Sequence, residues 1–365
     1  MTTIHDFTAA LEYCADHAMR AAVAVVVETD GSVYRRAGAR SVITEAGQIL
    51  GVISGGCAEQ DLLEHAKETW QTGQTLQTQY DFRSPDDLLW GMGAGCNGAL
   101  TVCLIPFDPL TDPDLAHRLQ DDLRRRADAS DSYVAVTVLQ SSDRNAWPIG
   151  PVPATVVSNL RDLPEVSATA PSLIRRTWDG TDVQLFVEVV SPRPRLVVFG
   201  AGDDARPLVR FAAAADWHVT VVDHRAESAS PTRFPEAAAL RVIRRDEYLS
   251  FDVDEAAFAV VMTHNYQLDR DVLQNLLPRS LDYLGVLGPR RRFDGLVQEV
   301  RAVGVELDAA YMAKVHSPVG LDIGAQTPEE IALSVIAEAI ACRRSRTGGS
   351  LREGVGAFDA KGAPT

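Results

Sequence analysis

The sequence predicts an α/β protein: a C-terminal Rossmann-like parallel sheet domain that follows a separate N-terminal α+β domain. Three observations support this fold class. The chain has 365 residues, more than one hydrophobic core usually holds. A proline-containing segment at 191–195 separates two regions of different pattern. Directly after it, a short apolar strand enters a glycine turn and a helix, the arrangement that begins a doubly wound parallel sheet.

Composition narrows the class of protein. Hydrophobic residues make up 46% and charged residues 23%, which is typical of a globular chain. A net charge of −15 argues against binding to nucleic acid or anionic membranes. Neither a membrane-spanning run of ~20 apolar residues nor a signal peptide is visible. The five cysteines show no CxxC spacing, which suits reduced thiols. We expect a cytoplasmic protein.

The N-terminal domain is predicted to cover residues 1–190 and to mix helices with strands. Apolar, β-branched runs bounded by turn residues predict strands, and helical periodicity predicts helices. The predicted strands are Ala22–Thr29, Ser41–Thr44, Gln48–Ile53, Ala99–Ile105, Tyr133–Leu139 and Val183–Val190. The predicted helices are an initial segment ending near Arg20, Ala58–Trp70 and residues 112–128.

The C-terminal domain is predicted to cover residues 191–346, with a disordered tail at 347–365. Its first strand enters Gly200-Ala201-Gly202, a helix follows, and a second strand ends at Asp223. This is the dinucleotide fingerprint, in which Gly200 permits the tight turn and Gly202 lets a pyrophosphate approach the backbone. Asp223 is expected to accept hydrogen bonds from ribose hydroxyls. The later segments are the strands Ala257–Met262 and Tyr283–Leu287 and a capped helix, Ile331–Arg343.

Whether this fold holds a nucleotide stays open. Asp203 and Asp204 stabilise the helix N-terminus but would repel a pyrophosphate there. Both a bound nucleotide and an empty Rossmann scaffold fit the sequence. His264 follows a strand, and His316 opens the loop SPVGLDIG; each is a candidate acid or base, or equally a residue that holds a loop in place.

In the first domain, two kinds of residue are chemical candidates. Cys57 follows Gly55-Gly56 at a helix start, and Cys96 lies in a second glycine-rich loop. A helix N-terminus favours the thiolate, so both are candidate sulfur or metal contacts; the alternative is a small buried residue in a tight turn. Arg35, Arg36 and Arg40 form a dense basic cluster, which suits a phosphate or carboxylate or is simply solvated.

Several segments together resemble the XdhC/CoxI family, accessory proteins of molybdenum hydroxylases. The segments span most of the chain: GSVYRRAGAR (31–40), GVISGGCAEQDL (51–62), GMGAGCNGAL (91–100), VVFGAGDDAR (197–206), THNYQLD (263–269), YLGVLGPRRR (283–292) and HSPVGLDIGAQTPEEIALSVIAE (316–338). SGGCAEQ and the last block are the most specific. One departure is Asp203, where many members carry a histidine.

The resemblance implies a binding and delivery role more than an enzymatic one. Family members bind the molybdenum cofactor, assist its sulfuration with a cysteine desulfurase, and deliver it to a xanthine dehydrogenase or carbon monoxide dehydrogenase type apoenzyme. They often self-associate, so we expect a homodimer. By position, the family's glycine-flanked cysteines are Cys57 and Cys96, and its basic loop holds Arg35, Arg36 and Arg40. Molybdenum–sulfur chemistry suits thiolates, and the molybdopterin phosphate suits arginines.

Two further functions remain alternatives. The first is an NAD(P)-dependent oxidoreductase that uses the glycine turn, with His264 as proton donor. The second is a regulatory sensor in which nucleotide binding changes the affinity for a partner. Binding of molybdopterin that depends on Cys57 or Cys96 would indicate the delivery role, and turnover of a carbonyl substrate with NAD(H) would indicate the dehydrogenase.

Overall fold

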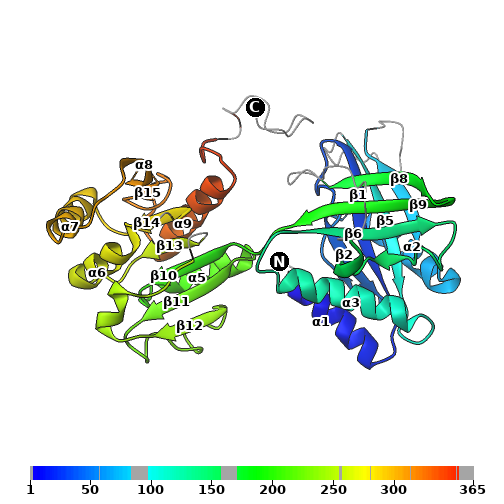
Figure 1. The fold of residues 1–365 in the computed structure, drawn as a ribbon, viewed down its shortest axis with the longest axis horizontal. Helices are drawn as coiled ribbons and strands as arrows, with labels where there is room; N and C mark the ends of the chain where they lie inside the picture. Colours follow the sequence, from blue (N-terminus) through cyan, green and yellow to red (C-terminus); the bar gives the residue numbers. More distant parts are fainter. Residues whose placement is uncertain are drawn as a thin grey trace. The chain divides into compact units, whose positions relative to one another are not determined.

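The structure, a computed structural model, describes residues 3–56, 58–83, 98–157, 171–254, 257–279, 281–312, 314–350 and 352. The chain forms two compact units that divide between Pro192 and Arg193. Figure 1 shows their elements along the chain. Most of the tail expected at 347–365, together with Cys57 and Cys96, lies outside the described residues.

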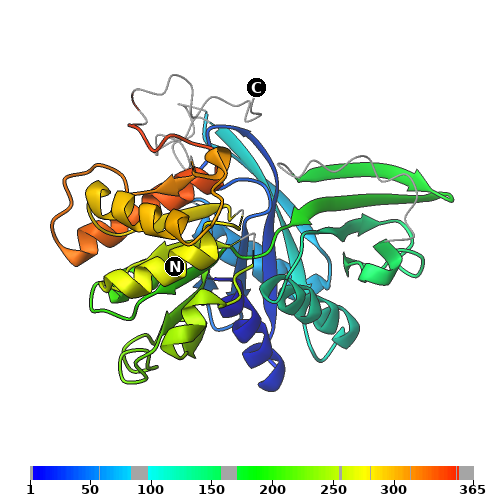
Figure 2. The ribbon, with the colours of Figure 1, turned by 60° about the vertical axis from the view of Figure 1, so that its left-hand side comes forward.

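The first unit contains two antiparallel sheets. Sheet A has the order β3-β2-β1-β5-β4, with bounds β1 Ala21–Gly31, β2 Arg40–Thr44, β3 Ile49–Leu50, β4 Leu76–Asp81 and β5 Gly98–Phe107. Sheet B has the order β7-β6-β9-β8, with bounds β6 Tyr133–Ser141, β7 Gly150–Pro151, β8 Ser172–Trp178 and β9 Thr181–Val190. The helices are α1 Ile4–Asp16, α2 Glu59–Thr72, α3 Pro113–Ala127 and α4 Ala154–Val157. Figure 2 shows β8 and β9 as a long green pair.

Sheet A is covered on both faces, which explains the unbroken apolar run of β1. Alternate side chains of a strand point to opposite faces. Val23 and Val25 pack into a core with α1, α3 and sheet B, whereas Ala22 and Ala24 pack into a second core with α2. The predicted strand 48–53 is wrong in length, because only Ile49–Leu50 pairs and Gly51 then turns the chain at φ +86°.

A buried carboxylate joins the two sheets of the first unit. Glu188 on β9 is 6% exposed and pairs with the guanidinium of Arg40 on β2. Its Oε1 also accepts from Nη2 of Arg126 on α3, at 2.9 Å. Arg126 Nε donates to Asp122, at 2.6 Å, and Arg40 Nη1 donates to the carbonyl oxygen of Gly38, at 2.8 Å. The four charged groups therefore satisfy one another inside the unit.

The second unit confirms the predicted Rossmann-like domain. Sheet C is parallel, with the order β12-β11-β10-β13-β14-β15, which is the doubly wound order 3-2-1-4-5-6. The strands are β10 Arg195–Phe199, β11 His218–Asp223, β12 Ala239–Val242, β13 Phe258–Val261, β14 Tyr283–Val286 and β15 Val315–His316. The helices are α5 Ala205–Ala214, η1 Arg245–Leu249, α6 Tyr266–Leu276, α7 Arg290–Ala302, α8 Ala309–Met312 and α9 Pro328–Arg343.

Helices cover both faces of sheet C. Side chains of α6 and α7 fill one core, and those of α5 and α9 fill the other (Figure 1). The capping box expected before α9 is present, with Thr327 Oγ1 accepting from the amide of Glu330 at 3.2 Å. Within the described ranges no helix is long and apolar enough to cross a membrane. Among the described residues, Cys14 and Cys103 are buried free cysteines, and Cys342 is a half-buried one.

Removing the carboxylate of Glu188 is expected to destabilise the first unit strongly. In Glu188→Ala, two buried guanidiniums lose their shared partner, a change that typically costs about 3–5 kcal/mol of unfolding free energy. Denaturant unfolding followed by circular dichroism measures this loss. Glu64→Ala is the matched control, because Glu64 forms an exposed pair with Lys67 and such pairs contribute about 0.2–1 kcal/mol. Equal losses in the two variants would contradict the role given to Glu188.

The same network is expected to weaken in acid. Burial alone would raise the pKa of Glu188, but Arg40 and Arg126 outweigh burial and hold it at about 2. The pKa of a glutamate in an unfolded chain is about 4.3. The stabilisation is therefore complete above that value and is lost as the pH falls towards about 2. The stability difference between the parent chain and Glu188→Gln should shrink over this interval.

Candidate functional site

In the first unit, motif loops meet at one end of sheet A. β1 ends at Gly31, directly opposite Gly98 at the start of β5. A Cβ on Gly98 would lie 2.6 Å from the carbonyl oxygen of Asp30 and 2.7 Å from that of Ser32, so only glycine fits this approach. The loop after β3 starts beside β2, because a Cβ on Gly51 would lie 2.7 Å from the carbonyl oxygen of Arg40, the first residue of that strand.

Two of these loops touch through an aromatic ring. Gly55 has φ +81°, and a Cβ placed on it would lie 3.4 Å from Cδ2 of Tyr34. Tyr34 is 61% exposed, and Arg35 and Arg36 beside it are also exposed. Within the described part of the chain, neither arginine has a carboxylate partner. Two positive charges with no carboxylate partner among the described residues therefore lie next to the glycine loop.

Arg40 has a different role from its two neighbours in the basic motif. Its guanidinium is largely buried and is paired with Glu188. An anionic ligand would have to displace that carboxylate to reach Arg40. We therefore leave Arg40 out of the candidate site. The contact of Arg40 with a cofactor, expected from the sequence, stays a prediction.

The loop that precedes α2 is fastened by a carboxylate that no sequence motif marked as functional. Glu59 Oε1 accepts from the amides of Ile53 and Ser54, at 3.1 and 2.9 Å. Its Oε2 accepts from the amide of Gly56 and the hydroxyl of Ser54, at 2.8 and 2.5 Å. The amide of Ala58 then donates to Ser54 Oγ, at 2.7 Å. Anchored amides thus stand on both sides of position 57 in the sequence.

In the second unit, the predicted fingerprint residues gather at the carboxyl ends of the strands. Gly200 has φ +117°, and a Cβ there would lie 2.4 Å from the carbonyl oxygen of Met262. His264 follows β13 at φ +57°, and its Nε2 lies 2.6 Å from Asp204 Oδ2. Gly202 lies next to this pair, because a Cβ on it would be 3.8 Å from the His264 ring.

The acidic residues of the fingerprint already have partners. Asp223 is 1% exposed, and it accepts from the amide of Ala201 at 2.8 Å and from the Arg225 guanidinium at 2.9 and 3.0 Å. Burial raises the pKa of Asp223, but these hydrogen bonds outweigh it and keep the pKa low. A ribose would have to compete with Arg225. Asp203 pairs with Arg233 at 2.9 Å, so its repulsion of an anion is partly neutralised.

His316 belongs to a separate cluster. Its Nδ1 lies 3.1 Å from Glu338 Oε1, and its ring stacks on Tyr283 with centroids 4.7 Å apart. Glu338 Oε2 also accepts from the Tyr283 hydroxyl at 2.7 Å and from the amide of Gly320 at 2.9 Å. These contacts fasten the loop after β15 to α9. They favour the loop-holding role for His316 that the sequence left open beside acid–base chemistry.

Glu59→Gln is expected to loosen the loop at 53–56, because a neutral amide oxygen accepts less strongly than a carboxylate and its NH₂ group faces donors. Hydrogen–deuterium exchange at Ile53, Ser54 and Gly56 should then accelerate roughly tenfold, a change of about 1.4 kcal/mol in the local opening. Glu64→Gln on the exposed side of α2 is the control. Unchanged exchange in Glu59→Gln would contradict the anchoring role.

The loop is also expected to loosen in acid. Burial raises the pKa of Glu59, but hydrogen bonds from Ser54 and Ile53 lower it overall. Protection of these amides should therefore persist below the usual glutamate pKa of about 4.3 and disappear as the pH falls through the lower folded value.

Comparisons with known proteins agree along both units. The model of the XdhC and CoxI family matches residues 14–81, and the model of the XdhC Rossmann domain matches residues 196–339.

A Bacillus subtilis protein, named as a probable subunit of xanthine dehydrogenase, is 33% identical over 89% of this chain and 93% of its own. The Escherichia coli molybdenum cofactor insertion chaperone PaoD is 24% identical over 88% of this chain and 83% of its own. A Bacillus halodurans crystal structure described as a xanthine dehydrogenase has a TM-score of 0.71 and 31% identity, over 93% of this chain and 96% of its own. The chain belongs to the XdhC and CoxI family.

Proposed function

We propose that this protein binds the molybdenum cofactor and inserts it into the apoenzyme of a molybdenum hydroxylase of the xanthine dehydrogenase type. The relatives named above support this role, since one is an insertion chaperone and another is named as part of a xanthine dehydrogenase. The same proposal includes three further properties: help with sulfuration of the cofactor by a cysteine desulfurase, a homodimeric state and a cytoplasmic location.

One observation carries the proposal on the structural side. Arg35 and Arg36 are exposed next to a glycine loop that Glu59 holds in shape. In a chain of net charge −15, a local pair of exposed guanidiniums suits an anionic group such as the molybdopterin phosphate. The amides of Ile53, Ser54 and Gly56 are already used by Glu59. The loop therefore contributes shape, and the arginines contribute the charge.

The oxidoreductase alternative has less support. Asp223, the expected ribose acceptor, is engaged with Arg225 and Ala201, and the insertion chaperone matches along most of the chain. NAD(P) binding at the glycine turn, and a sensor role that depends on it, remain hypotheses that nucleotide titration tests directly.

The variant Arg35→Ala/Arg36→Ala is expected to bind the cofactor at least tenfold more weakly. Each charge-assisted hydrogen bond contributes about 1.5–3 kcal/mol, and about 1.4 kcal/mol corresponds to a factor of ten. Anaerobic incubation with the cofactor, gel filtration and assay of the retained molybdenum and pterin measure the loss. Arg125→Ala is the control, because Arg125 is also an exposed arginine but belongs to α3 and not to the basic loop. Its guanidinium carbon lies 3.8 Å from the centroid of the Tyr133 ring. Full retention by the arginine double variant would remove the basic loop from the proposal.

The two glycine-flanked thiols are tested separately. Cys57→Ala/Cys96→Ala is expected to retain less cofactor in native mass spectrometry and to activate an apo-hydroxylase more slowly, because thiolates are good partners for molybdenum and sulfur. Cys103→Ala in the buried core is the control for a general effect on folding. Equal retention by the double variant and the parent chain would exclude the thiols from the mechanism.

A further inference from the structure

A thiol, an imidazole and a carboxylate lie in line at the edge of sheet C. Cys342 lies in the last turn of α9, and His316 ends β15, the edge strand of the sheet. The Sγ of Cys342 lies 3.5 Å from Nε2 of His316. On the other side of the ring, Nδ1 lies 3.1 Å from Oε1 of Glu338, one helical turn before Cys342. The thiol is half-buried and the imidazole is 28% exposed, so both groups have a surface open to solvent.

The carboxylate determines which nitrogen of His316 carries the proton. A carboxylate only accepts hydrogen bonds, so Nδ1 donates to Glu338, and the neutral ring directs the lone pair of Nε2 towards Cys342. Burial raises the pKa of Glu338, but hydrogen bonds from His316 and Tyr283 outweigh burial and lower it overall. The Tyr283 ring also stacks on the imidazole. The contacts that fasten the loop after β15 therefore also orient the ring.

The same geometry argues against a shared metal ion. Cys342 and Glu338 face different nitrogens of one imidazole ring, so a single ion could not bind all three groups at ordinary ligand distances. A nucleophile, a base beside it and a third group that orients the base form the arrangement used in nucleophilic catalysis.

The thiol of Cys342 depends on that base. Burial and the negative charge of Glu338 raise the pKa of the thiol, so the protonated form dominates near neutral pH. The thiolate, and not the thiol, is the nucleophile. His316 can take the proton as an electrophile approaches, whereas the resting thiol stays unreactive.

The position of Cys342 on α9 restricts the reaction. The last turn of a helix presents carbonyl oxygens and the negative end of the helix dipole. Acyl transfer needs N–H donors around a developing oxyanion, but here the amides of Ser345 and Arg346 donate to the carbonyls of Cys342 and Ala341. Transfer of a sulfur atom develops no oxyanion, because the charge passes from one thiolate to another. The cluster therefore suits sulfur transfer better than hydrolysis of an ester or amide.

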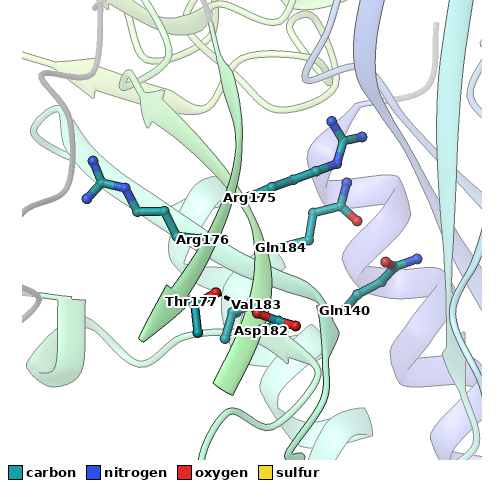
Figure 3. Close-up of a pocket in the computed structure, with 7 residues that line it drawn as sticks. All are labelled: Gln140, Arg175, Arg176, Thr177, Asp182, Val183 and Gln184. Carbon is teal, nitrogen blue, oxygen red and sulfur yellow. Dashed lines mark hydrogen bonds between the residues drawn. The ribbon is translucent and has the colours of Figure 1, made fainter. Parts of the chain in front are cut away.

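Two hollows in the first unit offer no comparable nucleophile. One, of about 330 Å³, is lined by Arg175, Gln184 and Asp182 among others, and Figure 3 shows the Thr177 hydroxyl bonded to Asp182. The second, of about 380 Å³, shares Gln140 and Asp182 with it. Among the described residues that line either hollow, none is a cysteine or a histidine. They present hydrogen-bonding groups but no group for a covalent step.

We propose that Cys342 accepts a sulfane (zero-valent) sulfur atom from a persulfide donor, with His316 as the base and Glu338 as the residue that positions it. The thiol gives its proton to Nε2 of His316, and Sγ attacks the outer sulfur of the donor, R–S–SH. The bond between the two donor sulfurs breaks. The donor leaves as a thiolate, which takes the proton from the imidazolium. Cys342 then carries the persulfide and the donor is a thiol, so the step consumes no further oxidant or reductant.

This inference deepens the proposed help with sulfuration and rests on it for the natural donor, a cysteine desulfurase that carries a persulfide. It adds a sulfur-accepting residue in the second unit. Cys57 and Cys96, in contrast, belong to the glycine-rich motifs of the N-terminal domain.

The test is anaerobic incubation of the reduced full-length protein with glutathione persulfide, followed by alkylation and peptide mass spectrometry. An added sulfur atom is expected on Cys342. Cys14 and Cys103 are buried and are the internal controls in the same chain, because a persulfide reagent reaches them far more slowly. Absence of added sulfur from Cys342 would overturn the proposal.

The role of the imidazole is tested by His316→Gln, which keeps a polar side chain but removes the base. The modification of Cys342 is expected to slow at least tenfold, since a positioned base typically contributes about 10²–10⁴-fold. His65→Gln is the matched control, because His65 is 29% exposed and also pairs with a carboxylate, that of Asp61. Equal rates in the parent chain and His316→Gln would contradict the proposal.

A structural effect of the substitution is separated by chemical rescue. In His316→Gly, imidazole added to the buffer is expected to restore part of the lost rate, because a free base can enter the space that the ring leaves. A folded His316→Gly variant that imidazole leaves slow would assign the ring a structural role and overturn its role as base. Thermal unfolding shows whether the variant is folded, and if it is not, His316→Gln decides.

The result is independent of the cofactor proposal, because the assay contains no molybdenum cofactor. Added sulfur on Cys342 in a protein that retains no cofactor would keep the thiol chemistry and remove the insertion role. Retention of cofactor by a protein whose Cys342 stays unmodified would remove the thiol chemistry and keep the insertion role.

Discussion

The first unit depends on one buried ionic contact, the carboxylate of Glu188 between Arg40 and Arg126. It brings together β9 of sheet B, β2 of sheet A and helix α3, three elements that are distant in sequence. Charges placed in a core are costly unless they are paired and hydrogen-bonded. Because these groups satisfy one another, the sheets meet in one arrangement, and apolar packing around Phe186 and Val25 completes it.

That arrangement explains why the candidate site lies at one end of sheet A. Arg40 is the first residue of β2, so its pairing with Glu188 fixes where the basic loop returns to the sheet. Gly31 and Gly98 fix where the loop leaves and where the second glycine-rich segment arrives. The exposed side chains of Arg35 and Arg36 are thus carried by a loop whose two ends are set by the core.

Much of the fold was accessible from the sequence, and the reasons differ by element. The second unit was predictable because its glycine turn and apolar strands are local patterns. β4 and β8 were missed, since LQTQYD and SLIRRTW are polar strands whose pairing comes from distant residues. Within the site, spacing alone could not separate Arg40 from Arg35, because the partner that distinguishes them is 148 residues away. A lone glutamate in the apolar run VQLFVEVV was the available signal for that partner.

The hydrogen bonds of Glu59 have a consequence for ligand binding by the glycine loop at residues 53–56. Its amides are satisfied when α2 forms, so the conformational entropy of ordering these residues is lost during folding and not during association. A loop prepared in this way adds no slow rearrangement to the encounter. For the ligand proposed for this loop, the association rate would then be governed by diffusion and by the sign of the local electrostatic field.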